Sequence, residues 1–374
     1  MSNQINFTEE QSMLLDTAMS FCQSHSPIET VRHQIENHKF DAEQWQAMVE
    51  LGWLGISIPE KYAGLGLGLG EVVPIVESMG RNLMVSPFLA STLATQVLVH
   101  GDNENLKNKY LPNIVNGSIA TLAIQELEGA WDINLNEALG KREGELITLS
   151  GTKFQVLDLD VAEIVIISIL LDKQVVLICI DQKEIPPENI KREIVIDETR
   201  NSFSLDLNGL KIQSSALVKL KDLKVIEQSA LLLLSAEMCG GLASTLNTII
   251  DYLNTRKQFD RLIGSYQALK HPTVDILLAL EALRSHLYYT AGQFGDGDSS
   301  DGDLEVALHM CKALASESFA YAGDRCIQFH GGFGFTYECD AQLFLRRAIW
   351  SQYQFGDEKY HRQLLAKLLL DECA

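Results

Sequence analysis

A glycine-rich stretch near the C-terminus, IQFHGGFGF (Ile327–Phe335), is the first part of the sequence whose residue types point to chemistry. It places three glycines among aromatic and polar side chains, between flanks that have helical periodicity. Glycine costs helix stability, so its presence indicates a backbone that must be exposed or closely approached. A bound cofactor would need such a backbone, and so would two tightly packed helices. The stretch is therefore a candidate cofactor cradle.

A second glycine run, GLGLGLG (Gly64–Gly70), has the glycine content of a phosphate-binding loop but not its context. No Gly-Lys-Ser/Thr sequence follows it, and no strand precedes it as in a βαβ unit. We interpret this run as a close-packed turn between helices.

The cysteines and histidines give little support for a metal site. The nine histidines are scattered, and the cysteines, odd in number, form no CxxC pair. Several cysteines lie in apolar helical patterns, which predicts reduced, mostly buried thiols without zinc or disulfides. The seven cysteines are Cys22, Cys179, Cys239, Cys311, Cys326, Cys339 and Cys373.

Composition and charge exclude several classes of partner. Hydrophobic residues make up 46% and charged residues 21% of the 374 residues, as in ordinary globular proteins. The net charge of −20 argues against nucleic acid and anionic membranes, which both need a basic footprint. No apolar run has the length of a membrane span, and the N-terminus lacks a signal-like segment. We expect a cytoplasmic protein.

The elements that must position these residues fall into three regions. Helical patterns fill residues 1–117, short β-branched runs fill 118–222, and helical patterns return over 223–374. This order predicts a multidomain α+β fold, with an N-terminal α-helical domain, a middle antiparallel β domain and a C-terminal helical bundle. The predicted strands are Ile119–Leu127, Leu146–Ser150, Glu163–Leu171, Gln174–Ile180, Ile194–Ile196 and Phe203–Leu207. The predicted C-terminal helices are a long one around Leu231–Leu253, then Tyr266–Phe294, Leu304–Phe329, Ala341–Tyr353 and a last one to Leu370.

This layout and five local patterns, in the same order along the chain, resemble the acyl-CoA dehydrogenase family. The patterns are FTEEQ (Phe7–Gln11), LGWLGISIPEKYAGLGLG (Leu51–Gly68), YLPNIVNG (Tyr110–Gly117), TRKQFDRLIGSYQALKH (Thr255–His271) and QFHGGFGFTYECDAQLFLRRA (Gln328–Ala348). The resemblance implies an α domain, a β domain and a C-terminal four-helix bundle, usually in a tetramer. It also implies FAD as cofactor and removal of a proton from Cα and a hydride from Cβ of an acyl-CoA.

The same resemblance implies that part of the chain serves a neighbouring subunit. In the family, the loop that matches Gln328, Gly331 and Gly332 reaches the adenosine end of a neighbour's FAD. The residues that match Arg256, Gln258 and Phe259 reach the same neighbour's pyrophosphate, which suits a guanidinium fork. The alternative is that Arg256 pairs with an acidic neighbour and that the glycines only let helices pack.

The positions that would serve the chain's own flavin depart from the family. A family stretch like ALTEPxAGSD reads AIQELEGAWD here, with Gln125 in place of Thr and Trp131 in place of Ser. A second stretch, KxWIT, reads KFQVL, with Gln155 and Leu157 at its aromatic and hydroxyl positions. The resemblance therefore predicts weak binding of FAD by the chain alone, although Gln125 and Gln155 could still hydrogen-bond the ring.

The catalytic base is also missing at both positions that the family uses. Counting from Gly331 places Phe355 where much of the family has a glutamate, and Phe355 cannot accept a proton. Relatives with the base on the long helix have it at the position of Ala230. Asp357 is the best substitute acid, and Glu358 and Glu237 are further ones. Asp357 could equally be the N-cap of the last helix.

Three hypotheses follow from these observations. The first is a catalytically degenerate acyl-CoA dehydrogenase subunit that completes the FAD site of an active homologue in a heterotetramer. The second is an active homotetramer or homodimer that oxidises an acyl-CoA with Asp357 as a displaced base. The third is a non-enzymatic binding protein. A nucleic acid is a poor partner for the third, because the net charge is −20.

Overall fold

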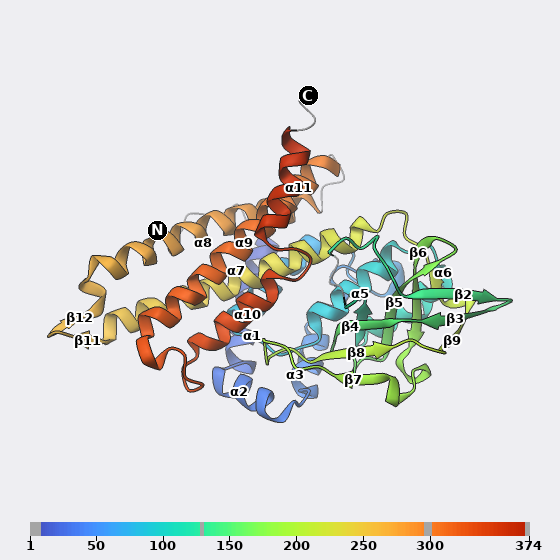
Figure 1. The fold of residues 1–374 in the computed structure, drawn as a ribbon, viewed down its shortest axis with the longest axis horizontal. Helices are drawn as coiled ribbons and strands as arrows, with labels where there is room; N and C mark the ends of the chain where they lie inside the picture. The colour runs from blue at the N-terminus through green and yellow to red at the C-terminus, as the bar shows by residue number, and fades with distance from the viewer. Residues whose placement is uncertain (1–8, 128–130, 295–300, 371–374) are drawn as a thin grey trace. The chain divides into compact units, whose positions relative to one another are not determined.

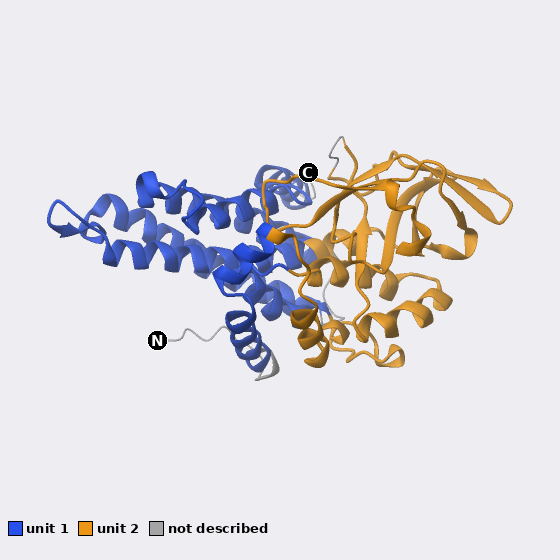
Figure 2. Ribbon diagram, turned by 90° about the horizontal axis from the view of Figure 1, so that it is seen from below, with its two compact units in different colours: residues 1–36, 69–85, 231–374 blue, residues 37–68, 86–230 orange. Residues whose placement is uncertain are grey.

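The computed structural model describes residues 9–127, 131–294 and 301–370, and it divides the chain into two compact units. Unit 1 comprises residues 1–36, 69–85 and 231–374, and unit 2 comprises residues 37–68 and 86–230 (Figure 2). Helices precede and follow a β-rich segment, so the predicted order of helices, strands and helices is confirmed. The three-domain boundaries at 117 and 222 remain a prediction, although β1 begins at Ala120 and α7 at Lys224.

Unit 1 is helical, and its long helices pack side by side (Figure 1). The predicted C-terminal helices are confirmed to within three residues at their ends, except that the long helix begins at Lys224, seven residues before Leu231. The helices that lie wholly or mostly in unit 1 are α1 (Glu9–His25), α2 (Ile28–Asn37), α4 (Val73–Arg81), α7 (Lys224–Thr255), α8 (Gln267–Gln293), α9 (Asp301–His330), α10 (Ala341–Gln352) and α11 (Glu358–Leu370).

Helix α7 is the centre of this helical packing. Its leucines recur every three or four residues, and Leu234, Leu242 and Leu246 are all buried. Two glycines let α4 and α7 touch: a Cβ at Gly80 would lie 2.0 Å from the Glu237 carbonyl oxygen, and one at Gly240 would lie 1.8 Å from that of Glu77. Among the described helices α7 alone is long and apolar enough to cross a membrane, yet 94% of its most apolar window is buried inside the protein.

Unit 2 contains two sheets and a few helices. A seven-stranded sheet has the order β10-β6-β5-β2-β3-β9, with β1 beside β5, and a three-stranded sheet has the order β4-β8-β7. The isoleucines and valines of β5 and β6 are almost all buried, and they form the centre of the core. The strands are β1 (Ala120–Ala123), β2 (Leu139–Glu143), β3 (Leu146–Ser150), β4 (Thr152–Leu157), β5 (Ile164–Leu171), β6 (Gln174–Asp181), β7 (Ile190–Arg192), β8 (Ser202–Asp206), β9 (Lys211–Gln213) and β10 (Leu217–Val218), and the helices are α3 (Ala42–Glu50), α5 (Phe88–His100) and α6 (Glu104–Val115).

The larger sheet is mixed, so the prediction of a purely antiparallel domain is wrong in this detail. β5 pairs in parallel with β1 and, over two residues, with β2. A short hairpin forces neighbouring strands to be antiparallel, but β1 and β5 are separated along the chain by β2, β3 and β4, so their connection is long enough for a parallel pair. The sequence patterns show where strands lie but not which of them become neighbours.

The predicted strand at Ile194–Ile196 is also wrong. The strand β7 forms earlier and pairs Arg192 with Phe203, and the Glu193 N–H then bonds the Ser202 carbonyl oxygen. Since β8 begins at Ser202, the next residues pass its end and find no partner strand. Ile194 is fully exposed there.

The other two sequence interpretations concern glycines and thiols. A Cβ at Gly64 would lie 2.0 Å from the Ile58 carbonyl oxygen, and one at Gly70 would lie 2.2 Å from that of Ala291, as expected of close-packed turns. All six cysteines in the described ranges are free and buried, so the prediction that most of the thiols are buried is confirmed. In those ranges no group of three or more His, Cys, Asp or Glu side chains could hold a metal ion.

Candidate functional site

A tight hairpin follows the C-terminal end of α7. Its strands β11 (Lys257–Gln258) and β12 (Arg261–Leu262) are joined by Phe259 and Asp260, whose φ angles are 53° and 58°. Two-residue hairpins favour this left-handed backbone, but it costs a residue other than glycine about 1–3 kcal/mol. Phe259 is 80% exposed at the tip, so its own packing does not offset that cost.

The glycine stretch follows the C-terminal end of α9, and its three glycines have different roles. Gly331 has a φ of 61°, a conformation that favours glycine. A Cβ at Gly334 would lie 2.4 Å from the Ile327 carbonyl oxygen, so packing requires that glycine. A Cβ at Gly332 would meet nothing within 4 Å, and its φ is not positive. The alternative that these glycines only let helices pack therefore accounts for Gly334 but not for Gly332.

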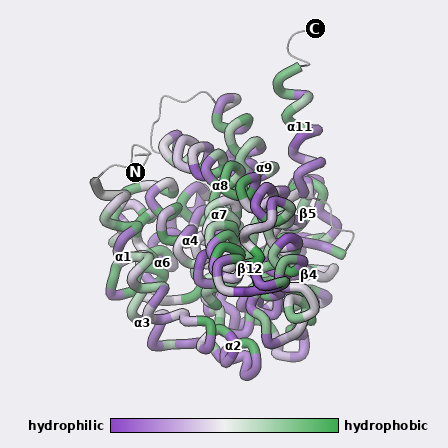
Figure 3. The backbone as a smooth tube through the Cα atoms, turned by 90° about the vertical axis from the view of Figure 1, so that its left-hand side faces the viewer, coloured by the Kyte–Doolittle hydropathy of each residue, from purple (hydrophilic) through white to green (hydrophobic). Residues whose placement is uncertain are grey.

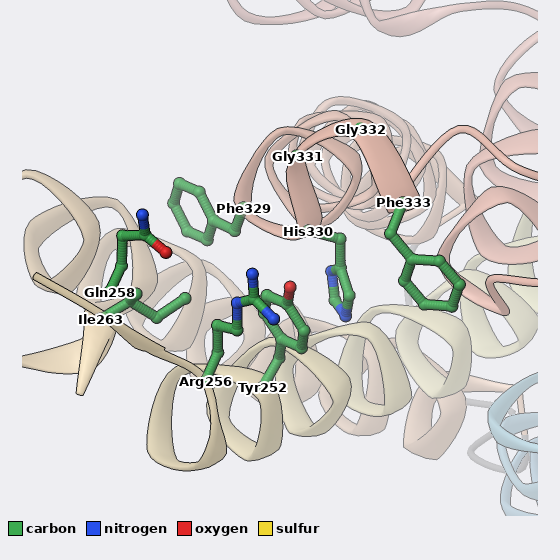
Figure 4. A pocket seen from close by; sticks show the side chains of 9 residues that line it. All are labelled: Tyr252, Arg256, Gln258, Ile263, Phe329, His330, Gly331, Gly332 and Phe333. Carbon is green, nitrogen blue, oxygen red and sulfur yellow. The ribbon is translucent and has the colours of Figure 1, made fainter. Parts of the chain in front are cut away.

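The hairpin and the glycine stretch enclose one pocket of about 470 Å³. Figure 4 shows Arg256 and Gln258 on one side of it and Gly331 and Gly332 on the other. The pocket is lined by Tyr252, Arg256, Gln258, Ile263, Phe329, His330, Gly331, Gly332 and Phe333. Segments some seventy residues apart in sequence thus meet at one pocket, which offers a guanidinium, an amide and bare backbone to one ligand.

A stacked pair of rings lies at the base of this pocket. The rings of Tyr252 and His330 have centroids 4.0 Å apart and planes inclined by 24° (Figure 4). The Nδ1 atom of His330 lies 2.7 Å from the Cys326 carbonyl oxygen, which can only accept, so Nδ1 carries the hydrogen. Sequence reasoning missed both residues. Two signals could have found them: Tyr252 is one helical turn before Arg256, and His330 directly precedes Gly331.

Arg256 makes no salt bridge with any residue that the structure describes. Its side chain is exposed and lines the pocket. The structure therefore does not support the alternative that Arg256 pairs with an acidic neighbour. A guanidinium held open beside bare backbone is suited to a phosphate or diphosphate.

Two predicted residues do not line the pocket. Gln328 is exposed on α9, and Phe259 is exposed at the hairpin tip. Neither is among the residues that line the pocket, so a role for them needs a ligand or surface that extends beyond it.

In unit 2, a buried ion pair joins the two stretches that would face the chain's own flavin. The Lys153 ammonium donates to the Glu126 carboxylate at 2.6 Å, and also to Asn136 Oδ1 and Ser168 Oγ. The Phe154 N–H bonds the carbonyl oxygen of Gln125 at 2.9 Å. Burial acts to raise the pKa of Glu126, but the Lys153 hydrogen bond and two backbone N–H groups outweigh it and lower that pKa. The Lys153–Glu126 ion pair and the backbone hydrogen bond therefore hold the two stretches together. Residues 128–130 lie outside the described ranges.

The ring-facing positions themselves do not offer what the resemblance expects. Gln155 sits in a bulge of β4 with a φ of 51°, and its N–H donates to the Glu193 carboxylate at 2.9 Å. At the position where the family pattern has an aromatic residue, the backbone N–H is therefore already bonded to the Glu193 carboxylate. Leu157 supplies no hydroxyl, and Trp131 is only partly buried. These residues do not fit an isoalloxazine ring in the way that the family pattern does.

Neither base position holds an ionisable group. Phe355 is half-buried and has a φ of 56°, so an unusual backbone conformation is kept there without a carboxylate. Ala230 is fully buried, and Leu231 beside it is 1% exposed.

The substitute acids are engaged in structural contacts. Asp357 is the N-cap of α11: its Oδ1 accepts from the Lys359 N–H at 3.1 Å and from the Tyr360 N–H at 2.8 Å. The Glu237 carboxylate is buried and lies 2.9 Å from the Arg347 guanidinium. Glu358 accepts from Gln352 Nε2 at 2.8 Å.

Comparison with known proteins agrees with this arrangement. The family model "Acyl-CoA dehydrogenase, N-terminal domain" matches residues 8–118, and "Acyl-CoA dehydrogenase, C-terminal domain" matches residues 230–370. The acyl-CoA dehydrogenase IpdE2 of Mycolicibacterium smegmatis is 26% identical over 93% of this chain and 95% of its own. The (R)-benzylsuccinyl-CoA dehydrogenase of Thauera aromatica is 26% identical over 98% and 97%.

Solved structures share the fold over nearly the whole chain. Butyryl-CoA dehydrogenase from Megasphaera elsdenii superposes with a TM-score of 0.87 at 19% identity, covering 98% of this chain and all of that one. The ChsE4–ChsE5 complex from Mycobacterium tuberculosis gives 0.88 at 22% identity, covering 98% and 99%. The chain therefore belongs to the FAD-dependent acyl-CoA dehydrogenase family.

Proposed function

We propose that this chain is a catalytically degenerate acyl-CoA dehydrogenase subunit that completes the FAD site of an active homologue. In this proposal the two subunits form a heterotetramer that dehydrogenates an acyl-CoA between Cα and Cβ. The partner supplies the base and binds the flavin ring. This chain supplies Arg256, Gln258, Gln328, Gly331 and Gly332 to the pyrophosphate and adenosine end.

The observation that carries the proposal is an asymmetry between two sets of residues. Of the set that would serve a neighbour, Arg256, Gln258, Gly331 and Gly332 line one open pocket, and Arg256 has no ion-pair partner in the described part of the chain. The set that would serve the chain itself has Gln155, Leu157 and Phe355 in place of an aromatic, a hydroxyl and a base. A sequence that decayed uniformly would have lost both sets alike.

Contacts in the structure count against the displaced-base alternative. Asp357 would have to abstract a proton while its Oδ1 accepts two backbone N–H groups at the start of α11. A carboxylate with this structural role is held at the helix N-terminus, where it satisfies backbone N–H groups of the first turn. Among known relatives, the ChsE4–ChsE5 structure is described as a complex, so mixed assemblies exist in proteins of this fold.

The sharpest test compares two arginines of one hairpin. In a co-purified complex with a homologous subunit, Arg256→Ala should lower the flavin content and the turnover. The lost charge-assisted hydrogen bonds are worth about 1.5–3 kcal/mol, on the order of tenfold or more in affinity. Arg261→Ala is the matched control, because Arg261 is exposed on β12 but does not line the pocket. If Arg256→Ala combined with Gln328→Ala leaves flavin and turnover unchanged, this chain does not contribute to the partner's site.

A further inference from the structure

The connection between α10 and α11, residues Tyr353–Asp357, keeps an unusual backbone. Phe355 has a φ of 56° and Gly356 a φ of 108°, so two consecutive residues lie in the left-handed region. A Cβ at Gly356 would lie 2.4 Å from Tyr360 Cδ1, so both conformation and packing require glycine there. Left-handed residues other than glycine persist only where their surroundings hold them.

Lys312, a buried lysine of α9, hydrogen-bonds the backbone of this connection. Lys312 Nζ lies 3.1 Å from the Gln352 carbonyl oxygen and 2.7 Å from that of Gly356, on either side of Phe355. Its third partner is Ser316 Oγ, at 3.0 Å. Lys312 is 0% exposed, and no carboxylate among the described residues lies within ion-pair distance of it.

These three partners satisfy both protonation states of Lys312. The ammonium donates to all three oxygens. The neutral amine can donate to the two carbonyl oxygens and accept from the Ser316 hydroxyl, which is both donor and acceptor. Burial lowers the pKa of Lys312 to about 7, although the Asp357 and Glu358 carboxylates act in the opposite direction. Lys312 therefore does not have to stay charged to hold the connection.

Two histidines complete the titratable surroundings of Lys312. The Nδ1 atoms of His309 on α9 and His361 on α11 lie 2.9 Å apart, so at least one of these rings is neutral. Burial, then the charge of Lys312 and then His309, lowers the pKa of His361 to about 2. Glu305 lies 3.9 Å from His309 on its far side. The groups that face Lys312 are thus Asp357, Glu358 and His361, with His309 and Glu305 behind them.

We propose that Lys312 is a proton-linked latch that positions the α10–α11 connection, so that this connection closes more tightly as the solution becomes alkaline. The proposal concerns the backbone at the former base position and does not depend on the lending of residues to a partner. It assigns the chain a residue that holds Phe355 and the start of α11 in place.

The direction of the pH effect follows from the linkage of protonation to closure. In the open state Lys312 is solvated with the ordinary lysine pKa of about 10.5, and in the closed state burial lowers that pKa to about 7. Between these values the open state binds one more proton than the closed state. Closure is therefore weakest below pH 7 and strengthens on the order of tenfold for each pH unit above it. His361 acts in the same direction, but only below its unfolded pKa of about 6.5.

Amide hydrogen exchange of the full chain between pH 7 and pH 9 tests this proposal, with each rate divided by the intrinsic rate at that pH. The protection of residues 353–361 should rise on the order of tenfold per pH unit in the wild type. The Lys312→Met variant should lack this rise. The matched control Lys367→Met, with the same substitution at an exposed lysine of α11, should keep it.

The wild-type profile alone decides the proposal should Lys312→Met not fold. A flat profile over 353–361 between pH 7 and pH 9 overturns it. A rise shared equally by β5 and β6 also overturns it, because the effect would then belong to global unfolding. The same rise in Lys312→Met would also overturn the proposal, because another group would then cause the effect.

Discussion

At the scale of single residues, Asp357 distinguishes the hypothesis of a catalytically degenerate subunit from that of an active enzyme with a displaced base. Its carboxylate caps α11 through the Lys359 and Tyr360 N–H groups. Asparagine caps a helix about as well as aspartate, whereas alanine does not. Asp357→Asn should therefore leave the stability unchanged, and Asp357→Ala should cost about 1 kcal/mol of unfolding free energy in a denaturant titration.

The same pair of variants reports on catalysis. If acyl-CoA oxidation by the chain alone is measurable and Asp357→Asn abolishes it, Asp357 is a base and not only a cap. We expect both variants to leave the turnover of a mixed complex unaffected.

Asp158 gives a prediction about pH. It is buried after β4 with a φ of 54°, and burial raises its pKa to about 7, with Asp160 acting in the same direction and Arg200 against it. Because the folded pKa lies above the unfolded value of about 3.8, its contribution to stability is present below pH 3.8 and is lost as the pH rises through 7. Asp158→Asn, which cannot ionise, should raise the thermal midpoint more at pH 8 than at pH 5. An equal shift at both pH values would mean that Asp158 is not protonated in the fold.

At the scale of elements, the Glu237–Arg347 pair joins α7 to α10. Both side chains are at most 5% exposed, and their charged atoms are 2.9 Å apart. Removing one partner of such a pair leaves a buried charge and costs about 3–5 kcal/mol, whereas replacing both with apolar residues is often neutral. Arg347→Met should therefore strongly lower the denaturation midpoint, and Arg347→Met with Glu237→Met should restore most of it. Equal losses in the single and double variants would contradict this account of the pair.

Helix α11 buries few of its side chains. In Figure 3 its first turns are hydrophilic and its last turns hydrophobic, yet Leu369 and Leu370 are 51% and 68% exposed. His361 is its one buried residue among those described. The Asp357 cap and the Lys312 contacts therefore hold the start of a helix that buries little else.

The elements also show what sequence patterns can and cannot give. The leucine spacing predicted α7 because periodicity reports directly on a buried face. Strand β2 was missed, since its residues are mostly exposed and polar, and β-branched residues at Ile194–Ile196 suggested a strand that has no partner. Pairing is a tertiary property, so the parallel contact of β1 with β5 could not be read from either strand.

At the scale of the whole molecule, family patterns located the pocket but not all of its walls. Arg256, Gln258, Gly331 and Gly332 line one pocket, where the segments that follow α7 and α9 come together. Tyr252 and His330 were missed although both adjoin predicted residues, and their stacking depends on how α7 and α9 pack, which sequence patterns do not give. The roles of these residues toward a partner remain predictions.

The flavin content of the purified chain, alone and together with a candidate partner subunit encoded beside it, tests the central claim most directly. Flavin absorbance per chain should fall well below one equivalent for the chain alone, because Gln125, Gln155 and Leu157 replace the hydroxyl and aromatic groups that the family pattern places against the ring. The mixed complex should retain flavin and oxidise acyl-CoA. One tightly bound FAD per chain in the isolated protein, together with acyl-CoA oxidation, would contradict the account.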